Sequence, residues 1–128
     1  MTATYTIRNL RTVEDSAPQF GLSDVQEARF AYDELEASDT GIAYYALKPD
    51  RRQPFGHHHE HAEEVYVVLR GSGRMKLDDE VVEVAALDAV RVSPEVVRAF
   101  EAGPDGLDVL AFGPRRKGDG ELLPGWWT

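Results

Sequence analysis

All four histidines of this chain lie within five consecutive positions. Alternate side chains of an extended strand point to the same face, so His57 and His59 are expected to share one. Two imidazoles and one carboxylate form a suitable ligand set for Zn, Fe, Mn or Ni. Glu64 is the best candidate for the carboxylate, and His61 or Glu63 would take its place in another register. The alternative interpretation is a solvated histidine-rich loop that binds metal only incidentally.

Short strands separated by turn signals must position these side chains. Glu64 opens a run of valines and tyrosine over residues 65–69 that is typical of a strand. The glycines at 71–73 predict a bend between strands, and Asp78-Asp79 predicts a tight hairpin. Further strands are expected at residues 42–47, 74–77, 80–84, 89–92, 97–102 and 107–112, with a turn at 103–106. This regular spacing predicts a β-sandwich or barrel rather than alternating strands and helices.

The two ends of the chain are less regular. Residues 4–10 alternate and predict a strand, and residues 11–23 predict an irregular arm with a short turn at 13–17. Residues 24–37 fit either a helix or a strand. Near the C-terminus, the basic run at 115–117 predicts a solvated turn. Trp126 and Trp127 are expected to cover the barrel or to lie in a subunit interface, and closing the mouth of the binding site is the weaker alternative.

The spacing His57-x-His59-x4-Glu64-x6-Gly71 resembles the first sequence motif of the cupin superfamily. Arg51 stands where the family has a leading glycine. The second motif is degenerate, since its Gly, Pro, Gly, His and Asn are replaced by Leu87, Ser93, Glu95, Arg98 and Ala102. Arg98 matters most, because it stands in the place of the family's third metal-binding histidine. A guanidinium has no lone pair to donate to a metal.

The resemblance implies an all-β fold: a single-domain double-stranded β-helix, the jelly-roll or cupin barrel. We expect one domain over residues 1–128. Its barrel core would span about 40–112, preceded by strands and an arm at 1–39 and followed by a tail at 113–128. The resemblance also favours a strand over residues 27–33.

A small β-barrel points alternate side chains into its interior. The predicted pocket therefore contains the metal ligands His57, His59 and Glu64, the substrate-binding candidates Tyr66, Arg98 and Phe100, and either Tyr44 or Tyr45. Two inward roles are open for Arg98. It would pair with Glu64 in place of a metal, or it would bind an anionic substrate beside one. An outward, solvated Arg98 is the third alternative.

Two functions follow from this pocket. The first is a binding or sensor module that binds a small anionic metabolite without turnover. This module would contain no metal if Arg98 takes the place of the metal ion. The second is a metal-dependent enzyme, since cupins include dioxygenases and sugar isomerases. The residues do not decide whether the protein is an enzyme, and a vestigial pocket is a third alternative.

Composition limits the partners. The chain has 128 residues, a net charge of −9 and no cysteine. The negative charge argues against nucleic acid and anionic membranes as partners, and the lack of cysteine restricts any metal to nitrogen and oxygen ligands. No apolar run has the length of a signal peptide or a membrane span, so a cytoplasmic location is expected. No nucleotide cofactor is indicated, and a homodimer is expected.

Overall fold

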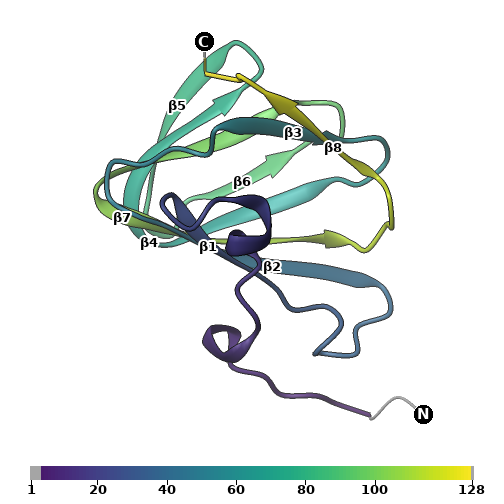
Figure 1. Ribbon diagram of the computed structural model, residues 1–128. Coiled ribbons are helices and arrows are strands. Elements are labelled where there is room, and N and C mark those ends of the chain that lie inside the picture. Colours follow the sequence, from purple (N-terminus) through teal and green to yellow (C-terminus); the bar gives the residue numbers. More distant parts are fainter. Residues whose placement is uncertain (1–3, 128) are drawn as a thin grey trace.

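The structure is a computed structural model that describes residues 4–127, and its regular secondary structure is almost all strand, in one curled antiparallel sheet (Figure 1). The strands are β1 (Gln26–Phe30), β2 (Thr40–Leu47), β3 (Phe55–His59), β4 (Glu64–Leu77), β5 (Glu80–Ala85), β6 (Ala89–Val92), β7 (Arg98–Pro114) and β8 (Gly120–Pro124). Two short 3-10 helices, η1 (Leu10–Thr12) and η2 (Ala17–Phe20), precede them. Within residues 4–127, no helix has the length and apolar content needed to cross a membrane. The predicted all-β barrel is confirmed.

Two long strands, β4 and β7, organise the barrel. They pair with each other along both of their halves, and β7 also pairs with β2 and, at Arg98, with β3. Strand β3 pairs along its whole length with β8. The barrel core lies between these strands and includes Tyr66, Met75, Phe100 and Leu107, each no more than 2% exposed. The strands that carry the predicted site therefore meet around β7.

The strands predicted at residues 42–47, 65–69, 74–77, 80–84 and 89–92 are present, and the hairpin at Asp78-Asp79 joins β4 to β5. The turns predicted at 71–73 and 103–106 are wrong, because β4 and β7 continue through these segments. The register of the two strands shifts there, as at a β-bulge. Gly71 has a φ of 82°, and a Cβ at this position would overlap the carbonyl oxygen of Gly106. The glycines thus let two long strands bend and touch without ending them.

Residues 4–10 do not form the predicted strand. Tyr5 and Ile7 are each 77% exposed, and no described strand pairs with this segment. Alternation is not sufficient for a strand, because the backbone N–H and C=O groups also need partners. The arm that follows contains η1 and η2 rather than a turn at 13–17. The ambiguous residues 24–37 contain a strand, as the family resemblance implied, although β1 ends at Phe30.

The C-terminal segment is part of the barrel. Strand β8, which was not predicted, covers the edge of β3. Trp126 packs on Gly56 of β3, and Nζ of Lys76 lies 4.3 Å from the centroid of the Trp126 ring. Trp127 donates a hydrogen bond from Nε1 to the carbonyl oxygen of Gln53 at 2.6 Å. The tryptophans therefore cover the barrel, which is one of the positions predicted for them.

Candidate metal centre and cavity

The structure brings the three predicted metal ligands together. His57 and His59 lie on one face of β3, and Glu64 begins β4. The Oε1 atom of Glu64 lies 3.0 Å from Nε2 of His59 and 3.5 Å from Nε2 of His57. Two ligands that each bind one ion at about 2.0–2.2 Å lie roughly 3 to 3.5 Å apart. The two distances to Glu64 are therefore those expected between ligands of one divalent metal, and all three donor atoms lie within 4.8 Å of one another.

The alternative ligands point elsewhere. His58 faces the opposite side of β3 from its two neighbours and pairs with a carboxylate of β8. His61 and Glu63 are exposed and do not join the cluster. A second group of potential ligand atoms lies near the surface and consists of Glu60, His61 and Asp119.

The protonation states of the cluster suit metal binding. Burial lowers the pKa of His57, which leaves its imidazole neutral with a lone pair to donate. Burial raises the pKa of Glu64, but hydrogen bonds with His57, His59 and Tyr66 outweigh it and hold that pKa well below its usual range. Burial also raises the pKa of Tyr66, so the phenol keeps its proton and donates it to Oε1 of Glu64 at 2.6 Å. The cluster thus offers a neutral imidazole at His57, a second imidazole at His59 and an ionised carboxylate at Glu64.

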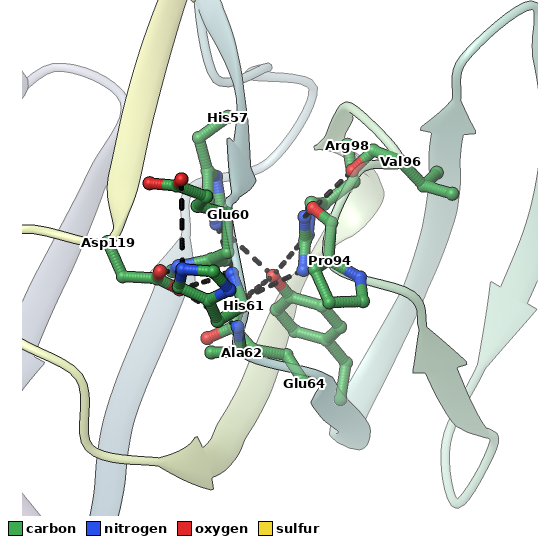
Figure 2. Close-up of polar contacts among 11 residues, drawn as sticks. His57, Glu60, His61, Ala62, Glu64, Pro94, Val96, Arg98 and Asp119 are labelled. Carbon is green, nitrogen blue, oxygen red and sulfur yellow. Dashed lines mark hydrogen bonds and ion pairs between the residues drawn. The ribbon is translucent and has the colours of Figure 1, made fainter.

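Arg98 is fully buried on the interior side of this cluster (Figure 2). Its Nη2 donates to Oε1 of Glu64 at 3.2 Å, and its Nε donates to the hydroxyl of Tyr66 at 3.1 Å. Its Nη1 donates to the carbonyl oxygens of Pro94 and Val96 at 3.3 and 2.7 Å. The outward orientation considered for Arg98 is therefore wrong, and the pair with Glu64 exists. Each of the three guanidinium nitrogens already has a protein acceptor.

A cavity of about 570 Å³ opens beside the cluster. His57, His59 and Glu64 form part of its wall, so an ion bound there would face the cavity. Tyr45 also lines it, whereas Tyr44 is buried elsewhere and donates a hydrogen bond to Asp108 at 3.2 Å. Tyr45 is therefore the tyrosine that reaches the pocket.

The three side chains predicted to bind substrate do not line this cavity. Tyr66, Arg98 and Phe100 are each no more than 2% exposed. The rings of Tyr66 and Phe100 pack edge to face, with their centroids 5.2 Å apart. Tyr66 and Arg98 lie behind the metal-ligand cluster and donate to Glu64, while Phe100 supports Tyr66. Direct contact of these side chains with a substrate stays a prediction.

Sequence reasoning missed Asp119. It lies just before β8, where its carboxylate accepts hydrogen bonds from the backbone N–H groups of His61 and Ala62 at 2.9 to 3.2 Å (Figure 2). Its Oδ2 lies 3.4 Å from Nδ1 of His59, a buried atom without a hydrogen-bond partner among the described residues. A carboxylate beside the far nitrogen of a metal-binding imidazole orients the ring and raises its basicity. No local signal marks Asp119, because the chain brings it to His59 only through the pairing of β8 with β3.

Replacing Asp119 with asparagine is expected to weaken the binding of a divalent metal about tenfold, the lower end of the range for such outer partners of metal-bound histidines. The amide keeps an acceptor for the backbone N–H groups but loses the charge beside His59. Competition with a chromophoric chelator measures this affinity, and a thermal melt of the metal-free protein checks the fold. Glu121→Gln is the matched control, since Glu121 pairs with the outward-facing His58. Equal metal affinities for the two variants would contradict the role of Asp119.

The fold and the cluster define a small β-barrel with a histidine- and glutamate-lined cavity, and the comparisons agree. The sequence matches the cupin domain family over residues 43–110, slightly more than half of the chain. The chain therefore belongs to the cupin family. None of the curated proteins is similar enough in sequence to count as a match.

Solved structures with the same fold come from several bacteria. A cupin protein from Bacteroides fragilis is 23% identical, with a TM-score of 0.68 over 91% of this chain and 88% of that one. The polyketide cyclase RemF from Streptomyces resistomycificus is 18% identical, with a TM-score of 0.72 over 97% and 85% of the two chains. The oxalate decarboxylase of Bacillus subtilis is also 18% identical, with a TM-score of 0.75 over 95% of this chain but 33% of its own. Identities this low establish the fold alone.

Proposed function

We propose that this protein binds a divalent metal ion through His57, His59 and Glu64 and that the ion helps to bind a small molecule in the adjoining cavity. One observation carries the proposal. Three side chains of the right type, with donor atoms at the right separation, form one wall of a cavity large enough for a small molecule. Burial keeps His57 neutral, and the carboxylate of Glu64 is ionised, as binding requires.

Each residue then has a distinct task. The two histidines and Glu64 hold the ion, which when bound supplies a positive charge that attracts or polarises an oxygen of the ligand. Tyr66 and Arg98 fix the orientation of Glu64 through its Oε1 atom. Similar structures include a polyketide cyclase and an oxalate decarboxylase, so the fold serves different chemistries, and no reaction is carried over to this chain. The predicted homodimer stays a prediction, and a metal-dependent enzyme stays one of the two alternatives.

The Arg98–Glu64 pair favours a second candidate, a metal-free module that binds a small molecule. The guanidinium already compensates the charge of Glu64, so the cluster does not need an ion for neutrality. However, Arg98 lies behind Glu64 and does not line the cavity. It therefore leaves the cavity side of both imidazoles accessible, and this placement is the reason to prefer the metal-binding function.

Elemental analysis of protein purified without a histidine tag tests the choice. We expect close to one equivalent of Zn, Fe, Mn or Ni per chain after incubation with each metal and removal of the excess. The double variant His57→Ala, His59→Ala is expected to lose this metal almost completely, because a single remaining carboxylate binds a divalent ion weakly. Melting curves of the metal-free proteins show whether the variant is folded.

Two single variants serve as controls. His58→Ala removes a histidine from the opposite face of the same strand, and His61→Ala removes one from the surface group with Glu60 and Asp119. Both are expected to keep the metal. Metal that is lost in His61→Ala but kept in the double variant would move the site to the surface group. A wild-type protein that takes up none of the four metals would overturn the proposal and leave the metal-free module.

A further inference from the structure

The basic run predicted as a solvated turn lies on the cavity. Arg115, Arg116 and Lys117 all follow β7 directly, and all three line the cavity that also contains the metal-ligand cluster. The acidic side chains in the same lining are Asp33 and Glu64. The cavity wall is therefore net positive in a protein whose overall charge is −9. A local reversal of sign at a cavity attracts anions that the rest of the surface repels.

Only one of these three cations has a structural role. Arg115 pairs with Asp33 at 2.8 Å, donates to the carbonyl oxygen of Ala37 at 3.1 Å and lies 4.3 Å from the centroid of the Tyr32 ring. Arg116 and Lys117 are exposed and have no hydrogen-bond or ion-pair partner within residues 4–127. Arg115 thus fixes the backbone of the run, and its two neighbours remain available to a ligand.

The position of Arg98 does not favour the anion contact predicted for it from the sequence, because its side chain does not line the cavity. Each of its nitrogens already donates to a protein oxygen, and its side chain is fully buried. An anionic ligand in the cavity therefore needs another cationic partner. Arg116 and Lys117 are the cations on the cavity without a protein partner.

The remaining wall of the cavity is aromatic, and it indicates the chemistry of the uncharged part of the ligand. Five of the ten phenylalanines and tyrosines of the chain line this cavity: Phe20, Phe30, Tyr32, Tyr45 and Phe55. The rings of Phe30 and Tyr45 meet edge to face, with centroids 6.0 Å apart. Phe20 and Phe30 are 59% and 37% exposed, which is unfavourable for large apolar side chains unless a ligand covers them. Aromatic walls contact flat ring systems through offset-stacked or edge-to-face packing.

We infer that the ligand is a flat, ring-containing anion whose charged group binds Arg116 and Lys117 while its rings pack against the aromatic wall. The inference rests on the proposed binding function and specifies the class of ligand. A planar guanidinium beside an ammonium group suits a carboxylate, sulfonate or phosphate, because the first binds in a bidentate manner and the second adds a point charge. The metal-ligand cluster then faces the ligand from another part of the same wall.

Three probes separate the two parts of this inference in calorimetric titrations of the metal-free protein. Naphthalene-2-sulfonate carries rings and a charge, octane-1-sulfonate carries the charge without rings, and 2-naphthalenemethanol carries the rings without the charge. Sulfonates are weak metal ligands, so the result does not depend on the ion. We expect naphthalene-2-sulfonate to bind at least tenfold more tightly than either of the other two. Equal binding of octane-1-sulfonate would overturn the ring-containing class.

The double variant Arg116→Ala, Lys117→Ala is expected to bind naphthalene-2-sulfonate at least tenfold more weakly and 2-naphthalenemethanol unchanged. Arg8→Ala, Arg51→Ala is the control, because it removes the same charge from exposed positions outside the cavity. Failure of the naphthalenesulfonate to bind, or equal loss in both double variants, would overturn the anion site. Either failure leaves the metal content of the wild type unaffected, so it is distinguishable from failure of the proposed function.

Discussion

Replacing Arg98 with methionine is expected to lower the free energy of unfolding by about 3 kcal/mol, the lower end of the range for breaking a buried ion pair. Arg98 is 0% exposed and donates to Glu64, Tyr66 and two backbone carbonyl oxygens. Methionine fills much of the same volume but leaves these acceptors without their donor. The side chain of Glu64 is 19% exposed, so water compensates part of the loss and the upper end of the range is not expected. Urea denaturation of the metal-free protein measures the change.

A double-mutant cycle with Glu64→Gln identifies the pair as the cause. If the ion pair carries the effect, the double variant loses clearly less stability than the sum of the two single variants, because each single variant leaves an unpaired charge. Additive losses would contradict this explanation. Arg91→Met is the matched control, since its pair with Glu63 is more than half exposed on both sides and is worth about 0 to 1 kcal/mol.

The second large effect is a gain in metal affinity. Replacing Arg98 with histidine is expected to tighten metal binding at least tenfold, which corresponds to about 1.4 kcal/mol or more. Residue 98 is the direct partner of His57 in the pairing of β7 with β3, so a third imidazole at 98 would start beside the first. The exchange also removes a positive charge that now lies 3.2 Å from Oε1 of Glu64 and opposes a divalent ion.

The Arg98→Met variant separates these two causes, because it removes the charge without adding a ligand. Competition titrations with a chelator should place metal affinity in the order histidine, methionine, arginine at position 98. Equal affinities for the histidine and methionine variants would show that only the charge matters. An affinity for the histidine variant no tighter than that of the wild type would contradict the assignment of His57, His59 and Glu64 as the site.

The strands were predictable where the evidence is local. Composition is one such signal, because the β-branched and aromatic run at 65–69 favours a strand, and alternation is another, since valines recur at every second position of 89–92. Glycine is ambiguous by contrast, because it permits a turn and a bulge equally well. The sequence at 71–73 therefore suggested a bend between two strands, whereas pairing with β7 keeps β4 continuous. Residues 4–10 show the opposite error, since their alternation has no partner strand.

The same distinction applies to the site. The grouping of His57, His59 and Glu64 follows from positions close in the chain, and the sequence predicted it. The orientation of Arg98 follows from its neighbours in the barrel, because Pro94 and Val96 supply acceptors that only the folded loop presents. Asp119 lies 58 positions after His61 and reaches it through β8, so no spacing rule could identify it.

The long strand β7 also has a consequence for how the chain folds. It pairs with β2 so that Thr40 lies opposite Pro114, and with β4 so that Val65 lies opposite Phe112. Such pairings close large loops before any stabilising contact forms, and chains dominated by them fold slowly. His57, His59 and Glu64 lie close in the chain, but Arg98 comes from β7, so its buried pair with Glu64 is expected to form only together with these long pairings. A chain stalled before that stage would leave Glu64 without its buried guanidinium partner, so formation of this pair would mark the completed barrel.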